Sequence, residues 1–418
     1  MNILLVGASG FVGRHLLNAL AANGHQIIAT SRRCGSVSVP GVAWQTLDLG
    51  LLADNPEHFQ WPENTELLIN AAGLLSVSSD ELDRVQSRGT CALFDLAAKH
   101  GARVLQISAL GAGEQPDIPF LETKAVADQY LLGLGSPVVI LRPSLLLGAG
   151  GASSGWLSRL SPLPLIALLD LNAQSQPLHI DDFVGAVLAL LRSWPTQPMV
   201  LPVVGPQPMT LPQVIDQLRD AQGWAPARYM KVSAPLAGVG VLLGDQFGWR
   251  ALNKQSLKMA GRDNLGDPEP LASICGYRAL PLASRLIGWP QAGQSVTLAL
   301  RPIFLAVMIL IWLGTAAVCL GPGYEWGLRI MSEAGITGGL ARLAVISGAL
   351  LDGVLGLGLL ATRWRRLALR TQLGLMLGYT AFITVVLPHY WFDPYAAVAK
   401  NLVLIVVTLW LLWTEPRK

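Results

Sequence analysis

Residues 2–20 read NILLVGASGFVGRHLLNAL, and this stretch decides the fold of the N-terminal part of the chain. A strand-like run, residues 2–6, passes directly into a glycine turn, and an amphipathic helical pattern follows. Gly7 permits the tight turn, Gly10 lets the backbone approach a pyrophosphate, and Gly13 lets the helix pack closely on the strand. The N–H groups that open such a helix bind phosphate oxygens. The residues of this turn predicted to bind a dinucleotide cofactor are Gly7, Ser9, Gly10, Phe11, Val12 and Gly13.

The tip of the second predicted strand carries basic side chains and no acidic one. This strand, residues 25–30, is followed by Ser31, Arg32 and Arg33. An acidic residue at this place would bind the ribose 2′-hydroxyl of NAD, whereas arginine accommodates the 2′-phosphate of NADP. The charge pattern therefore favours NADP(H) over NAD(H) as the cofactor. The alternative is a solvated basic loop without a ligand.

Three further strand patterns alternate with helical segments, as in a parallel sheet that is covered on both faces. They comprise residues 67–73, 103–108 and 138–143. Ligands of such sheets lie outside the carboxyl ends of the strands. Asp48 and Leu49, after the third strand, are expected near the adenine. The other residues expected around the cofactor are Ala71, Ala72, Gly73, Ser108, Ala109, Arg142, Pro143 and Ser144.

Taken in order, these motifs resemble those of extended and atypical short-chain dehydrogenases/reductases. The resemblance covers about residues 1–220 and is closest to the atypical branch that includes the complex I NADPH-binding accessory subunit. It implies an NAD(P)-binding Rossmann domain, an α/β doubly wound parallel sheet, with a small C-terminal lobe and linker over residues 221–298. The motifs that carry it are Gly7-x2-Gly10-x2-Gly13, Asp48–Leu49, Asn70–Gly73, Ser108–Ala109, Lys124, Arg142–Ser144 and His179–Asp182.

The family's catalytic Tyr-x-x-x-Lys pair is incomplete in this chain. In the family the phenol is the general acid/base, and the lysine lowers its pKa and binds the nicotinamide ribose. Here Phe120 stands in the place of the tyrosine, and Lys124 keeps the place of the lysine. Phe120 cannot exchange a proton. Ser108 and Lys124 therefore remain as the candidate catalytic residues, with Ser108 expected to donate a hydrogen bond to a substrate carbonyl.

Three hypotheses follow for the missing phenol. In the first, another donor supplies the proton, namely Thr123, Glu122 or water. In the second, the nucleotide is bound without turnover, as a structural or redox-sensing ligand. In the third, Tyr130 serves, although it lies six residues after Lys124 and is expected to pack on its helix. Since proton transfer typically contributes about 10²–10⁴-fold in rate, its loss leaves a slow enzyme unless it is replaced.

The motif His179–Asp182 opens a further predicted helix. We interpret Asp181 and Asp182 as an N-terminal cap that also favours the helix dipole. A metal site is the alternative, but no other residues supply ligands at a suitable spacing. The sequence therefore predicts no metal.

The last 120 or so residues have the composition of a membrane domain. Four apolar stretches are of spanning or nearly spanning length: 302–320, 340–360, 373–387 and 396–413. Charged residues make up only 14% of the chain, and the mean hydropathy is +0.45. The stretches resemble the DoxX-like membrane family. We therefore expect an all-α four-helix transmembrane domain over residues 299–418.

Basic residues indicate how this domain is oriented. Arginines are concentrated between the second and third spans, and two basic residues follow the fourth span. By the positive-inside rule, that loop and both chain ends are cytoplasmic, in a multi-pass protein of the inner membrane. The residues concerned are Arg363, Arg365, Arg366, Arg370, Arg417 and Lys418.

Asp352 lies in the middle of the second span, where an ionisable residue is costly. One hypothesis is structural, with Asp352 bonded to Arg342 or Lys400 of a neighbouring helix. The other is a role in proton transfer or in binding a quinone. Both place Asp352 in the interior of the helical bundle.

Together, these observations predict a membrane-anchored NAD(P)H-binding oxidoreductase of the short-chain dehydrogenase type, acting on a lipidic or quinone-like substrate. The alternative is a non-catalytic NADPH-binding module for redox sensing or assembly, with a membrane-protein partner. The expected partners are a nicotinamide dinucleotide and the lipid bilayer. The net charge of +3 is too small to indicate a nucleic acid partner.

Overall fold

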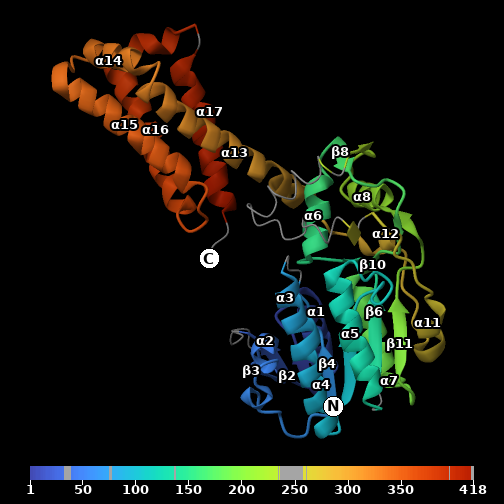
Figure 1. Ribbon diagram of the computed structural model, residues 1–418. Helices are drawn as coiled ribbons and strands as arrows, with labels where there is room; N and C mark the ends of the chain where they lie inside the picture. The colour runs from blue at the N-terminus through green and yellow to red at the C-terminus, as the bar shows by residue number, and fades with distance from the viewer. Residues whose placement is uncertain are drawn as a thin grey trace. The chain divides into compact units, whose positions relative to one another are not determined.

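A computed structural model describes residues 1–32, 39–74, 78–135, 138–233, 235, 258–259, 261–394 and 396–415. The chain divides into two compact units, Met1–Ser295 and Val296–Lys418. The first contains a seven-stranded parallel sheet in the order β11-β6-β5-β4-β1-β2-β3 (Figure 1). Its strands are β1 (Asn2–Val6), β2 (Gln26–Ser31), β3 (Val42–Thr46), β4 (Leu67–Asn70), β5 (Arg103–Ile107), β6 (Val138–Pro143) and β11 (Met199–Val203).

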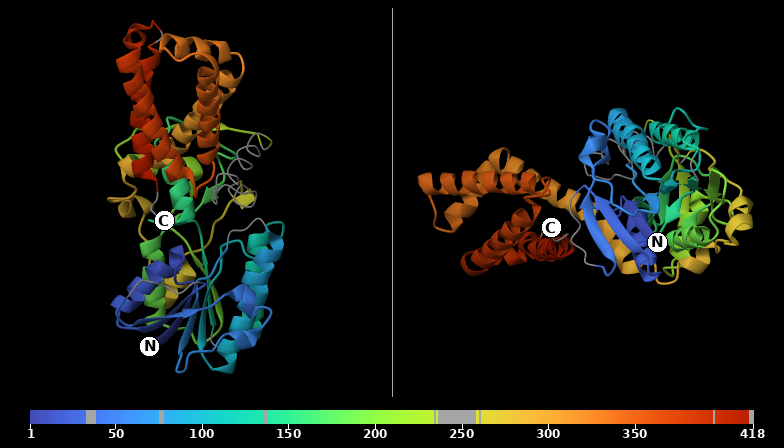
Figure 2. Two further views of the ribbon diagram at one scale, coloured as in Figure 1. Left: turned by 90° about the vertical axis from the view of Figure 1, so that its left-hand side faces the viewer. Right: turned by 90° about the horizontal axis from the view of Figure 1, so that it is seen from below.

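Helices cover both faces of this sheet, as Figure 2 shows in its left-hand view. One face packs against α1 (Phe11–Ala22), α7 (Ile180–Arg192) and α11 (Glu269–Cys275). The other packs against α2 (Leu49–Leu52), α4 (Gly89–Lys99) and α5 (Pro119–Gly133). Both faces are buried, which explains why the strands are continuously apolar and do not alternate. The predicted doubly wound α/β sheet is confirmed, and its strand order reverses between β1 and β4, where such folds bind ligands.

A smaller lobe of the first unit has its own hydrophobic core. This core joins Leu157, Ile166 and Leu218 to Leu282 and Leu286. The lobe therefore combines segments that lie before and after residue 220. Its elements are β7 (Leu146–Leu147), α6 (Ala152–Leu160), β8 (Leu165–Leu168), β9 (Gln174–Ser175), β10 (Leu178–His179), β12 (Met209–Thr210), α8 (Leu211–Asp220), β13 (Arg228–Lys231) and α12 (Leu282–Arg285). The short elements η1 (Pro56–His58), α3 (Ser79–Leu82) and η2 (Asp83–Arg88) lie within the sheet domain.

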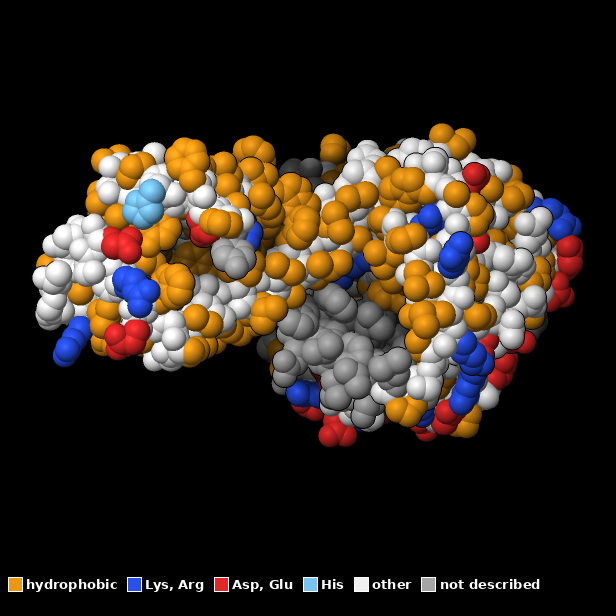
Figure 3. Space-filling model, turned by 90° about the horizontal axis from the view of Figure 1, so that it is seen from above, with side chains coloured by type: hydrophobic (Ala, Val, Ile, Leu, Met, Phe, Trp, Pro, Cys, Tyr) orange, Lys and Arg blue, Asp and Glu red, His pale blue; other side chains and the backbone are white. Residues whose placement is uncertain are grey.

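The second unit is helical throughout its described part. Its elements are α13 (Ala292–Leu320), which begins in the first unit, α14 (Tyr324–Glu333), α15 (Gly338–Gly358), α16 (Arg365–Val386), η3 (Pro388–Phe392) and α17 (Ala397–Thr414). Among the described residues, α13, α15 and α16 are long and apolar enough to cross a membrane, and α17 is apolar but shorter. The outer surface of this unit is largely hydrophobic on the face shown in Figure 3, as a lipid-facing surface would be.

One element of this unit differs from the prediction. The predicted spans end at residue 320 and resume at residue 340 with no helix predicted between them, but residues 321–339 contain the ten-residue helix α14. This helix is amphipathic and shows no apolar run of spanning length, so hydropathy alone does not reveal it. An amphipathic helix of this kind is suited to the membrane–water interface.

Candidate functional site

The glycine turn between β1 and α1 has the geometry that close approach to a phosphate requires. Gly7 has a φ of +77°, and a Cβ on it would lie 2.7 Å from the Ala72 nitrogen. A Cβ on Gly13 would lie 2.1 Å from the Gly7 carbonyl oxygen, so only glycine lets α1 start this close to the strand. Ser9 and Gly10 are exposed, and Gly10 is the N-cap of α1. The start of the helix is therefore open to an anion.

The ends of β2 and β3 extend this site. The Ala8 N–H donates to the Thr30 carbonyl (3.1 Å), which ties the glycine turn to the tip of β2. Ser31, the last residue of β2, is buried, and Arg32, which follows it, is exposed, whereas Arg33 lies outside the described residues. At the end of β3, Asp48 caps α2 by accepting a hydrogen bond from the Gly50 N–H (2.8 Å), and Leu49 is buried beside it.

Lys124 connects the ends of β4 and β5. It projects from α5, and its Nζ donates to the carbonyls of Ala72 and Ile107, each at 3.0 Å. Burial lowers the pKa of this ammonium group to about 8. Gly73, next to Ala72, is exposed, and a Cβ there would lie 3.9 Å from Nζ. The lysine is thus fixed at the edge of the sheet where the predicted site lies, with one of its three protons left over.

The contacts of the side chains around Phe120 can be compared with the proton donors considered above. Thr123 is buried, and its hydroxyl donates to the Pro119 carbonyl (2.9 Å) of its own helix. Glu122 is exposed. Tyr130 donates to the Asp95 carboxylate (2.6 Å), which raises the pKa of the phenol to about 12. The hypothesis that Tyr130 serves as the acid is therefore wrong, because this phenol is engaged on the surface of α4.

Ser108 takes part in a buried network that the sequence analysis missed. Its hydroxyl donates to Asp128 Oδ2 (2.7 Å), and Arg142 donates to the same oxygen (3.0 Å). Burial raises the pKa of the Asp128 carboxyl, against the opposing effects of Ser108 and Arg142. In this arrangement the Ser108 proton is directed to Asp128 and away from any substrate. The sequence could have indicated Asp128 as a member of the site, because it follows Lys124 by four residues and therefore lies on the same face of α5.

Pro143 and Ser144, at the end of β6, are both buried. The Ser144 hydroxyl donates to the Gln176 carbonyl, and its N–H donates to the Val203 carbonyl (3.1 Å). The described residues predicted to bind the cofactor lie at the carboxyl ends of strands or in the first turn of the helix that follows, except Lys124, which reaches this edge from α5.

Asp182 does not cap its helix. The N-cap of α7 is His179, whose Nδ1 accepts a hydrogen bond from the Asp181 N–H (3.3 Å). Asp182 is fully buried and binds Arg285 at 2.7 and 2.9 Å and the Tyr277 hydroxyl at 2.9 Å. The cap interpretation was wrong for Asp182, because its partners are about a hundred residues away in the sequence. In the described part of the chain, no group of three or more His, Cys, Asp or Glu side chains is placed to hold a metal ion.

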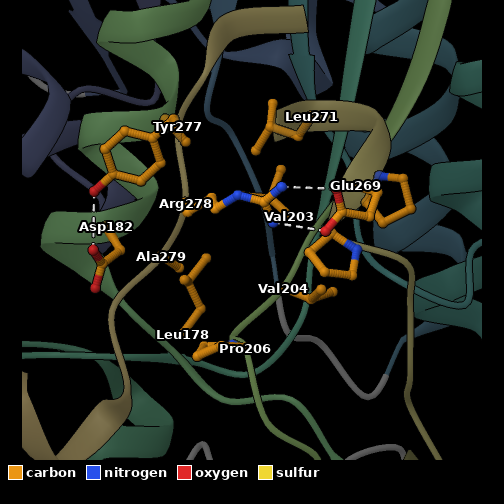
Figure 4. A pocket seen from close by; sticks show the side chains of 13 residues that line it. Leu178, Asp182, Val203, Val204, Pro206, Glu269, Leu271, Tyr277, Arg278 and Ala279 are labelled. Carbon is orange, nitrogen blue, oxygen red and sulfur yellow. Dashed lines mark hydrogen bonds and ion pairs between the residues drawn. The ribbon is translucent and has the colours of Figure 1, made fainter. Parts of the chain in front are cut away.

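The Tyr277–Asp182 contact lines a cavity of about 240 Å³ (Figure 4). Val203 and Pro206 form one side of this cavity, and an Arg278–Glu269 ion pair lies across it. It adjoins the edge strand β11, which is separated from β1 by β6, β5 and β4. This cavity is therefore distinct from the glycine turn between β1 and α1.

Two family models match the chain. The model of the NAD dependent epimerase/dehydratase family matches residues 3–198, and the model of the DoxX-like family matches residues 309–409. These two segments lie in the first and second compact units, respectively.

Curated relatives match about half of the chain at low identity. A ceramide reductase of Caulobacter vibrioides is 25% identical over 228 residues, which are 53% of this chain and 67% of that protein. The mitochondrial NADH dehydrogenase (ubiquinone) 1 alpha subcomplex subunit 9 of Dictyostelium discoideum is 24% identical over 239 residues, which are 55% of this chain and 65% of that protein. The chain thus spans about two thirds of the length of these relatives.

Solved structures share the fold of the first unit. MoeE5 in complex with UDP-glucuronic acid and NAD aligns with a TM-score of 0.54 and 18% identity over 71% of this chain and 99% of that chain. The dTDP-glucose 4,6-dehydratase of Bacillus anthracis in complex with NAD gives a TM-score of 0.54 and 16% identity, over 69% and 94%. The shared Rossmann-like fold, the two family matches and the apolar helices together show an epimerase/dehydratase-like Rossmann domain followed by a DoxX-like domain whose helices are long and apolar enough to cross a membrane.

Proposed function

We propose that this protein is a membrane-anchored, NAD(P)H-dependent reductase of a ketone group on a lipid. The observation that carries the proposal is the position of Lys124, fixed at the ends of β4 and β5 beside the glycine turn. A relative named ceramide reductase supports a lipid as the substrate, and so does the apolar helical unit of this chain. The glycines of the turn provide a cradle that a Cβ would fill.

The reaction requires a hydride and a proton. When bound, the reduced nicotinamide supplies the hydride to the ketone carbon. Lys124 supplies the proton to the resulting alkoxide oxygen, in place of the phenol that Phe120 lacks, and the neutral amine is reprotonated from solvent. A pKa of about 8 suits this task, because a general acid works best when its pKa lies near the working pH.

The cofactor we propose is NADP(H). Arg32 is exposed just beyond the tip of β2, and the sequence adds Arg33 beside it without any acidic residue at the tip. Replacing Arg32 with Ala should raise the KM for NADPH by about tenfold or more and leave the KM for NADH nearly unchanged. Arg192→Ala is the matched control, because Arg192 is an exposed arginine in the last turn of α7. Equal effects of Arg32→Ala on both coenzymes would contradict the preference.

The proposed location is the inner membrane, with both chain ends cytoplasmic. The basis is the arginine-rich segment between α15 and α16, which the positive-inside rule assigns to the cytoplasm. This orientation gives the N-terminal unit access to the cytoplasmic pool of reduced nicotinamide cofactor.

The test of the activity uses the full-length protein in lipid nanodiscs. The 3-keto analogue of ceramide and a panel of other long-chain ketones are supplied, and NADPH oxidation is followed together with the lipid product by mass spectrometry. We expect slow turnover that Lys124→Met abolishes and Phe120→Tyr accelerates, because a phenol would restore a second proton donor. Gln129→Ala, on the exposed side of the same helix, should leave the rate unchanged.

A second candidate is a non-catalytic NADPH-binding module that supports redox sensing or assembly of a membrane complex. Phe120 favours it, and so do the relatives named as subunits of NADH dehydrogenase. Binding of NADPH in calorimetry without turnover on any ketone or quinone would favour this candidate over the reductase. Absence of coenzyme binding would contradict both.

A further inference from the structure

The second unit carries an excess of positive charge where α13 enters it, α16 begins and α17 ends. In the described segments that meet there, residues 296–305, 357–374 and 408–415, Glu415 is the one acidic side chain. The same segments contain five arginines, so four positive charges are left over: Arg301, Arg363, Arg365, Arg366 and Arg370. Guanidinium groups that are held close together repel one another, so such an excess calls for a counter-charge.

Contacts to Glu415 bring three of these arginines to one place. Its carboxylate is paired with Arg301 of α13 and lies 3.8 Å from Arg365 of α16. Its backbone carbonyl accepts a hydrogen bond from Arg366 (3.0 Å). One carboxylate neutralises one guanidinium group, so two of the three positive charges remain. The cluster therefore attracts a further anion.

The arginines differ in how far they reach the surface. Arg301 and Arg365 are largely covered, with side chains that are 20% and 14% exposed. Arg366 is half-buried, and Arg363 and Arg370 are exposed. Arg366 and Arg370 lie four residues apart and therefore on one face of α16. A ligand can reach these two guanidinium groups from the surface, so the site needs no enclosed cavity.

Exposed apolar side chains flank the arginines. Trp364 and Leu367 stand on either side of the arginine pair 365–366, and both are exposed. Trp413, near the end of α17, is exposed as well. Tryptophan and arginine together are typical of a membrane–water interface. A free inorganic anion would use the charges alone, whereas a lipid would also cover these apolar side chains.

We propose that this end of the second unit binds an anionic phospholipid, one whose headgroup phosphate is not balanced by an amine. Arg366 and Arg370 would donate to the phosphate oxygens, and Glu415 would hold Arg301 and Arg365 beside them. The acyl chains would cover the exposed apolar side chains of α16 and α17. Basic clusters between helices at the cytoplasmic surface of a membrane bind such headgroups. This proposal goes beyond the reductase function and holds whether or not the first unit turns over.

The experiment measures lipid binding by the full-length protein in detergent with native mass spectrometry. Phosphatidylglycerol is the probe, and phosphatidylcholine with the same acyl chains is the comparison. We expect phosphatidylglycerol to bind at least about tenfold more tightly, because each arginine near an anionic headgroup contributes about fivefold in affinity. The double variant Arg366→Ala/Arg370→Ala should lose about tenfold or more of this affinity for the same reason.

Arg329→Ala is the matched control for the double variant. Arg329 is exposed on α14, and Glu325 and Glu333 lie four residues before and after it, so its charge is balanced on its own helix. We expect this variant to bind both lipids like the unchanged protein. Unchanged phosphatidylglycerol affinity in the double variant, or equal losses in the control, would overturn the proposal.

Measurements on the unchanged protein test the proposal even where the double variant does not fold. Equal affinity for the two lipids would overturn it. Inorganic phosphate and glycerophosphate share the anion but lack the chains, so we expect them to displace the lipid only at concentrations at least about a hundredfold higher. Displacement at concentrations equal to that of the lipid would show a site for free anions and would overturn the assignment to a phospholipid. Bound lipid is counted directly, so loss of NADPH oxidation would not be mistaken for failure of this site.

Discussion

Lys124 is the residue whose ionisation should govern turnover. Burial lowers its pKa from 10.5 to about 8, so the ammonium form that donates the proton is lost above that pH. We expect kcat/KM for ketone reduction to be level below pH 8 and to fall about tenfold per pH unit above it. The measurement is a pH profile of NADPH oxidation with the 3-keto lipid. A profile that stays level to pH 10 would show that Lys124 is not the donor.

The ionisation of Lys124 affects the free energy of unfolding in the opposite direction, because this energy rises with pH where the rate is expected to fall. The folded protein holds this proton less tightly than the unfolded chain, because the pKa is lowered by folding. Between pH 8 and about 10.5 the unfolded state therefore binds more protons, and the contribution of Lys124 to the free energy of unfolding rises with pH. A fall in kcat/KM between pH 8 and about 10.5 would thus reflect loss of the proton donor and not a destabilisation of the fold caused by Lys124.

Gly13 should tolerate no side chain. A Cβ on it would lie 2.1 Å from the Gly7 carbonyl and 2.8 Å from the Ala8 Cα, both of which belong to backbone that cannot move aside cheaply. We expect Gly13→Ala to lose coenzyme binding in calorimetry and to lower Tm. Gly133→Ala in α5 is the control, because nothing lies within 4 Å of the added Cβ and alanine favours a helix. If Gly13→Ala binds NADPH like the unchanged protein, the turn does not have the proposed role.

At the scale of elements, Asp182 joins α7 to the segment that contains Tyr277 and Arg285. Its carboxylate is fully buried, and Arg285 is its charged partner. Removing Arg285 leaves that charge uncompensated, so Arg285→Ala should cost about 3 kcal/mol and lower Tm by several degrees in scanning fluorimetry. Arg278→Ala should cause no measurable shift, because the Arg278–Glu269 pair is exposed. Equal shifts in the two variants would contradict this account of Asp182.

The elements also show how much the sequence could reveal. Five strands of the sheet, β1, β2, β4, β5 and β6, were predicted to within a few residues, because buried parallel strands form continuous apolar runs that end in glycine or polar residues. The edge strand β11 was not predicted. β1 and β6 have the predicted bounds. The partners of Asp182 and Asp128 were missed, because they depend on contacts across the fold that periodicity does not encode. The motif singles out Lys124 in the sequence, and only the structure gives its two carbonyl acceptors.

At the scale of the whole molecule, one end of the helices in the second unit carries a cluster of arginines around a glutamate. Glu415, at the end of α17, is paired with Arg301 of α13 and lies 3.8 Å from Arg365 of α16. The Glu415 carbonyl also accepts a hydrogen bond from Arg366 (3.0 Å). Three helices are therefore joined at their arginine-rich end, which is the end that the positive-inside rule assigns to the cytoplasm.

The proposed orientation predicts opposite labelling from the two sides of the membrane. Ser332 is exposed on α14, and Arg363 is exposed in the turn between α15 and α16. In a variant whose four cysteines are replaced by serine, Ser332→Cys should react with an impermeant maleimide in intact spheroplasts, whereas Arg363→Cys should react only after the membrane is opened. The two variants serve as controls for each other, because the same reagent must reach one site and not the other. The reverse pattern would place the nucleotide-binding unit on the side that lacks the cytoplasmic pool of reduced cofactor, and the proposed reductase would then have no source of hydride.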